Sequence, residues 1–230
     1  MPISGIVNTA RALSYYLRQQ EVTANNLANV NTDSFKVDRV SARQIKGTAY
    51  PTPVEKIDFR QASFRETERP LDVALDGPGF LTVQTEHGDR LIRGGSLKLD
   101  TAGRLANEHG DLLLGENGPI LIQGARVEMR GDGTVVVDGA IAGRLRIETV
   151  DDPTTLLKEG IGRYLSKTPA RPVEDGSTRL RQGAVEEPNQ DPLLSMVELV
   201  SIQRSYAANV DALKAMDSVL GVIAGEVGKV

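Results

Sequence analysis

The hydrophobic pattern at the N-terminal end of the chain differs from the pattern in its middle. Apolar or small residues recur every three or four positions, and no proline interrupts them. They are Ile3, Ile6, Ala10, Leu13, Leu17, Ala24, Leu27 and Val30. This spacing predicts one long helix, whose apolar face is interrupted midway by Gln20 and Glu21. At 1.5 Å per residue, a helix of ~27 residues is ~40 Å long, which exceeds the diameter of a small domain.

The C-terminal end shows the same spacing more clearly. Asp191 and Pro192 have the residue types of a helix cap and a first helical position. A heptad seam follows, made of Leu199, Ile202, Tyr206, Asn209, Leu213, Met216, Leu220 and Ile223. Its polar member, Asn209, is of the kind that fixes the register of paired helices. The apolar surface is widened by Val197, Val200, Ala207, Val210 and Val219, so we expect this helix to have more than one partner.

Between the two ends, short runs of β-type residues alternate with glycine-rich turns from Leu71 to Leu180. Turn signals such as Asp76-Gly77 and Asp132-Gly133 separate the runs. Strands at this spacing predict an antiparallel sandwich or barrel-like domain rather than a βαβ arrangement.

The sequence therefore predicts an α+β fold, with long N- and C-terminal helices that pair as a coiled-coil-like stalk and flank one antiparallel all-β domain. The expected division is a helix at 1–31, an extended or irregular connection at 32–66, the β domain at 67–186 and the second helix at 187–230. Each helix alone would expose an apolar stripe, and such stripes favour assembly. The alternative is that both helices fold back onto the β domain of their own chain.

Composition narrows the classes of function. The net charge is −4, only 4% of residues are aromatic and tryptophan is absent, which argues against a nucleic-acid binder. The lack of cysteine excludes disulfides and thiolate metal sites. No stretch approaches the roughly 18 apolar residues of a membrane span. We also expect no cleaved secretory signal, because the first residues lack a basic and an apolar region.

The search for catalytic patterns returns one repeated tetrapeptide. His87 and His109 each stand in a Glu-His-Gly-Asp sequence, which is compatible with a His/Asp dyad or a metal site but is more typical of two turns. We therefore expect no enzyme, no catalytic residue, no cofactor and no metal. The alternative of another class is an enzyme or ligand-binding β domain on an oligomerisation stalk. That alternative requires carboxylates that converge with one of the two histidines in a pocket.

Four blocks of sequence carry a resemblance to a known family. Ala24–Thr32 with Ser34-Phe35-Lys36 closely resembles the N-terminal signature of bacterial flagellar rod and hook proteins, where glycine usually stands at the position of Ser34. The segments 69–83, 93–115 and 182–209 are similar to the blocks that follow in that family, with Glu187–Gln190 replacing a usual Ser-Asn-Val step. The blocks occur in the family's order and span nearly the whole chain.

The resemblance implies a structural subunit of the flagellar basal-body rod. Family members are exported unfolded through the flagellar type III apparatus without signal cleavage. Their terminal helices then pack into the inner tube of an axial filament, with the β domain as an outer layer. The implied partners are copies of the chain, other rod and hook proteins, and the export apparatus. The implied location is the rod, which is periplasmic in a cell with two membranes.

The resemblance also implies which residues contact neighbouring subunits. The candidate assembly interface consists of Leu13, Leu17, Asn25, Asn26, Leu27, Asn29, Asn31, Phe35, Leu199, Ile202, Arg204, Tyr206, Asn209, Leu213, Met216, Leu220 and Ile223. The asparagine-rich part would brace the turn that leaves the first helix. Ordinary helix termination explains the same residues, and both roles can hold together.

Among members of the family, the length of 230 residues leaves little room for the extra outer domains of hook proteins. The compact length and the run Gly143–Ile147 look more like the proximal than the distal rod protein. The distal rod protein or a hook-type protein is the alternative. A third possibility is a chaperone or assembly cap that shares the same termini.

Overall fold

The chain is described here from a computed structural model that covers residues 2–43, 52–160, 162–174 and 176–227; the side chains of 2–4, 43, 52 and 223–227 are outside the description. It divides into two compact units. The helical unit comprises Met1–Val30, Asp38–Lys56 and Gln190–Val230, and the β unit comprises Asn31–Val37 and Ile57–Asn189. The predicted α+β class, with long terminal helices that contact each other and flank antiparallel sheets, is confirmed.

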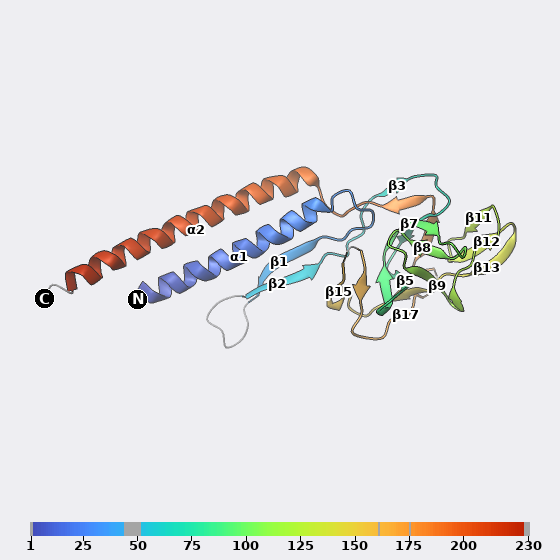
Figure 1. Ribbon diagram of the computed structural model, residues 1–230, viewed down its shortest axis with the longest axis horizontal. Coiled ribbons are helices and arrows are strands. Elements are labelled where there is room, and N and C mark those ends of the chain that lie inside the picture. Colours follow the sequence, from blue (N-terminus) through green and yellow to red (C-terminus); the bar gives the residue numbers. More distant parts are fainter. Residues whose placement is uncertain (1, 44–51, 161, 175, 228–230) are drawn as a thin grey trace. The chain divides into compact units, whose positions relative to one another are not determined.

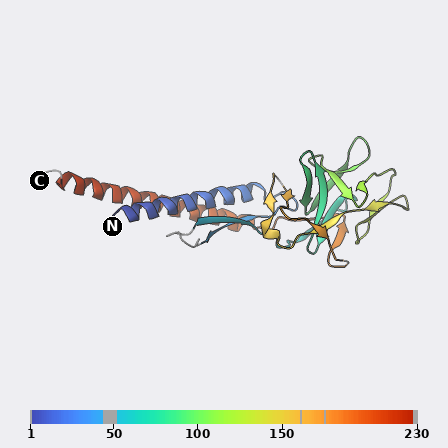
Figure 2. The ribbon, with the colours of Figure 1, turned by 90° about the horizontal axis from the view of Figure 1, so that it is seen from below.

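The helical unit contains α1 (Pro2–Ala28), α2 (Pro192–Val227) and a hairpin of β1 (Asp38–Arg43) and β2 (Thr52–Ile57). Figures 1 and 2 both show the two helices side by side, with the hairpin next to α1. Arg18 of α1 fastens the hairpin, because its guanidinium donates to both carboxylate oxygens of Glu55 at 2.5 and 2.8 Å. The hairpin lies in a stretch that the sequence analysis expected to be extended or irregular.

The start of α2 has the predicted cap. The Asp191 carboxylate accepts hydrogen bonds from the backbone N–H groups of Leu193 and Leu194 at 2.8 and 3.2 Å, and Pro192 occupies the first helical position. These bonds satisfy donors that a helix leaves without partners in its first turn. The prediction of Asp191 as the cap is confirmed.

The β unit is built from short strands, and every pairing described in it is antiparallel. The strands of its largest sheet are β15 (Leu157–Lys158), β16 (Tyr164–Leu165), β6 (Gly88–Ile92), β5 (Phe80–Thr85), β9 (Leu112–Gly115), β8 (Leu105–Asn107), β7 (Gly94–Leu99), β4 (Asp72–Asp76) and β18 (Arg179–Gln182), in that order, with β10 (Gly118–Pro119) on β9, β14 (Ile147–Thr149) on β5 and β17 (Arg171–Pro172) on β14. Smaller sheets pair β11 (Val127–Met129), β12 (Thr134–Val137) and β13 (Ala140–Arg144), and β3 (Phe64–Glu66) with β19 (Ala184–Glu186).

The core of the β unit lies where these sheets face one another. Val73, Leu75, Val83, Leu105 and Leu113 are each completely buried. A second cluster joins Phe80 and Tyr164, whose rings meet edge to face. Both β4 and β5 are buried over four consecutive residues, which are apolar except for Asp72 in β4 and Thr82 in β5, so neither strand alternates between apolar and polar residues.

One glycine of the third sequence block has a defined backbone role. Gly94 pairs with Ala74 of β4 and has a φ of 130°, in the region that favours glycine. A Cβ at this position would lie 2.5 Å from the carbonyl oxygen of Val73. Glycine is therefore required for β7 to begin so close to β4.

Candidate assembly surfaces and a polar pocket

Helix α2 carries apolar residues on two opposite faces. Its inner face contains the seam predicted from the sequence and contacts α1: Ile202 is buried, and Thr9 of α1 lies 4.0 Å from the Met216 sulfur, measured from its hydroxyl oxygen. Leu199, Tyr206, Asn209, Leu213 and Leu220 are half-buried. The side chain of Ile223 is outside the described residues.

The outer face of α2 is exposed. Leu193, Val197 and Val200 lie about half a turn around the helix from Ile202, given 100° per residue, and their exposed fractions are 72%, 65% and 47%. Val219 and Val222, at 58% and 62%, are also strongly exposed farther along the helix. A helix that is apolar on both faces is normally enclosed by more than one neighbour. Among the described residues, α1 is the helix that packs against α2.

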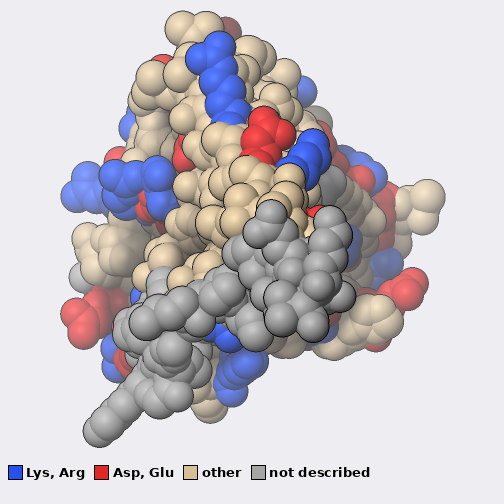
Figure 3. All heavy atoms as spheres, turned by 90° about the vertical axis from the view of Figure 1, so that its left-hand side faces the viewer, with Lys and Arg blue, Asp and Glu red and all other residues tan. Residues whose placement is uncertain are grey.

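Figure 3 views the molecule from the side on which Figure 1 shows the helix ends. Much of the described surface there is uncharged, with a few Lys, Arg, Asp and Glu side chains between. We use the name outer face for Leu193, Val197, Val200 and Val222, whereas Val219 lies at the border between the two faces. The sequence pattern indicates that Val197, Val200 and Val219 broaden the apolar surface, but it does not separate an inner from an outer face.

The asparagine motif at the end of α1 makes contacts within its own chain. The Asn26 side chain pairs with the backbone of Asp38 as a neighbouring strand would, donating to its carbonyl at 2.8 Å and accepting from its N–H at 3.0 Å. The Asn26 carbonyl accepts a hydrogen bond from Gln190 at 2.5 Å. Asn29 donates to the Asn25 carbonyl at 2.9 Å and so closes the end of the helix. These bonds give the motif a bracing and terminating role inside the chain.

The residues after this motif keep the backbone geometry for which glycine is usual. Ser34 has a φ of 59°, which is the left-handed conformation, and its hydroxyl is buried with no hydrogen-bond partner among the described residues. Phe35 is 1% exposed and Lys36 is completely buried. Burial lowers the pKa of Lys36 from its ordinary value, although the nearby Glu186 carboxylate opposes this effect.

The predicted interface residues therefore fall into three groups. Asn26, Phe35 and Ile202 are buried inside their own chain. Leu13, Leu27, Asn29 and most of the seam are half-buried. Leu17, Asn25, Asn31, Arg204 and Met216 are exposed and available to a neighbour. The role of the set in contacts between subunits stays a prediction.

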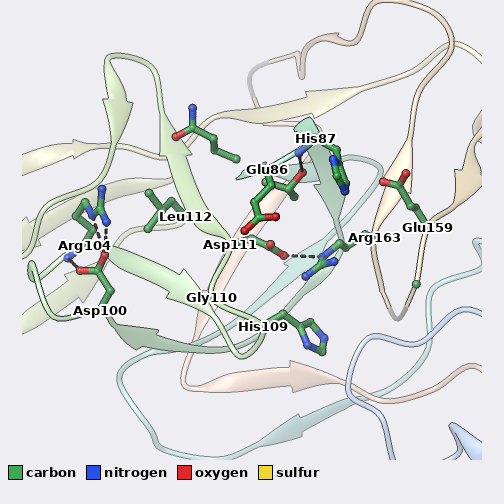
Figure 4. Close-up of a pocket in the computed structure, with 13 residues that line it drawn as sticks. Glu86, His87, Asp100, Arg104, His109, Gly110, Asp111, Leu112, Glu159 and Arg163 are labelled. Carbon is green, nitrogen blue, oxygen red and sulfur yellow. Dashed lines mark hydrogen bonds and ion pairs between the residues drawn. The ribbon is translucent and has the colours of Figure 1, made fainter.

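A polar pocket of about 780 Å³ in the β unit brings both histidines to one site, as the alternative hypothesis required (Figure 4). His87 and His109 lie on opposite sides of the ion pair between Asp111 and Arg163, which is 2.6 Å long. His87 and His109 are both exposed, and each lies at the tip of a β-hairpin.

Three of the carboxylates that line this pocket, those of Asp100, Asp111 and Glu159, form ion pairs with arginines. Asp111 accepts from Arg163 and, at 2.7 Å, from the Asn107 amide. Arg90 donates to Glu159 and thereby lowers the pKa of that carboxyl. A general acid needs the opposite shift. Within the described residues, no hydrogen bond joins either histidine ring to a carboxylate, and no group of three or more His, Asp or Glu side chains is arranged to hold a metal ion. The pocket thus lacks the geometry of a His/Asp dyad.

Neither helix, over its described residues, combines the length and apolarity that crossing a membrane requires. The arrangement is that of a structural subunit: a helical unit with an exposed apolar face, joined to a separately packed β unit. Two family models match the chain at its ends. The model described as "Flagella basal body rod protein" matches residues 7–36, and the model described as "Flagellar basal body rod FlgEFG protein C-terminal" matches residues 181–225.

Individual relatives that match over most of the chain belong to the same family. The chain is 30% identical to the flagellar basal-body rod protein FlgF of Caulobacter vibrioides over 217 residues, which are 87% of each protein. It is 30% identical to FlgF of Escherichia coli over 233 residues, covering 91% of this chain and 92% of that one. FlgG of Bacillus subtilis is 24% identical over 237 residues, 87% of this chain and 90% of the relative.

This chain belongs to the flagellar basal-body rod protein family. It is a structural protein of that family rather than an enzyme, as its sequence predicted. The resemblance that was based on the four sequence blocks is confirmed.

Proposed function

We propose that the chain is a proximal-rod subunit of the FlgF type, which assembles with other rod subunits through its terminal helices into the axial drive shaft of the flagellum. Two FlgF relatives are 30% identical to it, whereas FlgG of Bacillus subtilis is 24% identical. The observation that carries the assembly role is the outer face of α2. A chain that functioned alone would gain free energy by burying these side chains, and this one leaves them in water.

The physical driving force for assembly is burial of the outer face against a neighbouring subunit. Transfer of one Val or Leu side chain from water to a packed interface contributes about 1.5–3 kcal/mol. Leu193, Val197 and Val200 occupy the first two to three turns of α2, so a neighbour's helix that lies along these turns contacts all three. Such contacts repeat in every subunit of a rod.

The proposed partners are copies of this chain, other rod and hook proteins, and the flagellar export apparatus. The proposed location is the part of the rod that lies in the periplasm of a cell with two membranes.

The mass of the protein recovered from purified basal bodies tests the export route. A mass that shows removal of an N-terminal leader of 15 or more residues would contradict export by the flagellar apparatus without signal cleavage.

The decisive experiment places a charge on the outer face. Val197→Glu is compared with Gln203→Glu, which adds the same charge at an exposed polar position of the same helix. Both chains should fold, because Val197 is 65% exposed. We expect at least a tenfold loss of Val197→Glu protein from purified basal bodies and near-normal incorporation of Gln203→Glu, measured by quantitative mass spectrometry. Equal incorporation of the two variants would overturn the proposal.

A further inference from the structure

The four residues Ser34–Val37 are all buried, and separate segments of the β unit hold them. The Ser34 N–H donates to the Glu186 carbonyl at 2.6 Å, and the Val37 N–H donates to the Asn189 side chain at 2.9 Å. On the other side, the carbonyl of Val37 accepts from the Asp58 N–H at 2.8 Å. The segment that follows α1 is thereby fixed beside residues 186–189, which precede α2.

A buried ion pair reinforces these backbone contacts. The Lys36 ammonium lies 2.6 Å from a carboxylate oxygen of Glu186, and neither side chain has any solvent exposure. The ammonium also donates to the Arg60 carbonyl at 2.9 Å. A charge removed from water is costly unless it is paired and hydrogen-bonded. Lys36 and Glu186 therefore depend on each other to occupy these positions.

A second cation faces the same carboxylate. Arg93 is 5% exposed, and its Nε lies 3.5 Å from the other oxygen of Glu186. Its guanidinium also donates to the carbonyls of Gly77 and Gly79, which holds it in place. The buried Glu186 carboxylate thus lies between two buried cations, and it also accepts from the Ala62 N–H at 2.9 Å.

We propose that Lys36, Glu186 and Arg93 form a charge latch that seats Ser34–Val37 on the β unit, with Lys36 as the positioning residue. The latch joins residues 150 positions apart, so the seating of the segment after α1 depends on a strand far along the chain. An apolar side chain at the buried position of Lys36 would fit in several ways, whereas a hydrogen-bonded charge has one position. This proposal rests on contacts within one chain and is independent of the proposed function.

The test is hydrogen exchange of the full-length chain at low concentration, read by peptide. Lys36→Met keeps the aliphatic stem but removes the charge, and Glu186→Gln leaves two buried cations without an anion. In both variants we expect the amides of 34–37 to exchange on the order of 100-fold faster or more, with Glu186→Gln the stronger. In the double variant, which combines Lys36→Met with Glu186→Gln, the amides of 34–37 should exchange more slowly than the sum of the two single effects predicts, because the two side chains act as a pair.

Arg65→Met is the matched control. Arg65 forms an ion pair of 2.7 Å with Asp33, which directly precedes Ser34, but the Arg65 side chain is 51% exposed. Exposed ion pairs contribute little to stability, so in Arg65→Met the exchange rate of the amides of 34–37 should change less than about threefold.

The strands β4–β9 should stay protected in Lys36→Met. Unchanged exchange of 34–37 in Lys36→Met overturns the latch. Equal loss of protection across β4–β9 also overturns it, because the ion pair would then support the whole unit. If Glu186→Gln does not fold, Lys36→Met still decides between these outcomes.

Discussion

The helical unit and the β unit use apolar residues in opposite ways. In the β unit, residues such as Val73, Leu75 and Val83 have no exposure, so its core is complete within one chain. In the helical unit, Leu193 and Val197 are 72% and 65% exposed although they lie in a well-formed helix. One unit therefore encloses its apolar core, whereas the other leaves an apolar face exposed along α2. Under the proposed function, the difference separates a part whose core is complete within the chain from a part that a neighbouring subunit covers.

The sharpest test of this comparison is a pair of leucine substitutions. Leu75→Ala removes a completely buried side chain from the β unit and should lower the free energy of unfolding by about 2–5 kcal/mol. Leu193→Ala makes the same chemical change on the outer face and should cost less than about 0.5 kcal/mol in the monomer. Urea unfolding of the dilute protein measures both. Similar costs at the two positions would show that Leu193 is covered within its own chain.

Ser34 offers a smaller effect at the start of the β unit. Ser34→Gly should raise the free energy of unfolding by about 1 kcal/mol, because glycine relieves the left-handed backbone and removes a buried hydroxyl without a partner among the described residues. Ser34→Ala is the control, since it removes the hydroxyl but keeps the backbone strain. A gain from alanine as large as that from glycine would assign the effect to the hydroxyl alone.

Acid should weaken the β unit through three turn carboxylates. Backbone N–H groups donate to Asp100, Asp132 and Asp138 and lower the pKa of each below the ordinary 3.8. As the pH falls, the unfolded chain takes up these protons first, so their contribution to stability is complete above about pH 5 and is lost as the pH falls through the lowered pKa values. Thermal unfolding from pH 6 to pH 3 measures this. Asp138→Asn should flatten the dependence slightly, and a steeper dependence in that variant would contradict the assignment.

The sequence predicted those features that depend on local patterns. Three-four spacing located both helices, and Asp191 with Pro192 marked the beginning of α2, because caps and first turns involve neighbouring residues. Glycine-rich turns between β-type runs indicated antiparallel strands. The inner face of α2 was visible as a seam for the same reason.

Features that depend on distant residues were not predictable. The hairpin β1–β2 has a polar sequence and is positioned by Arg18 and Asn26 of the helix beside it. The partner of Lys36 lies 150 residues away, so nothing near Lys36 indicates that its charge is buried. The sequence placed His87 and His109 in two similar turns, but only the fold shows that both turns border one pocket with paired carboxylates.

The hydrogen bond between Ser34 and Glu186 has a consequence for how such a protein can change over evolution. The first segment of the β unit, Asn31–Val37, thereby lies beside its last residues. The long segment Ile57–Asn189 also begins and ends at neighbouring points, because the Asn189 side chain donates to the Asp58 carbonyl at 2.6 Å, and domains inserted into another chain commonly have such neighbouring ends. Loops and strands between these two points can lengthen, shorten or be exchanged without altering the distance between the places where the chain enters and leaves the unit. Selection can therefore modify the β unit as a separate module while the helices that flank it in the sequence keep their own spacing.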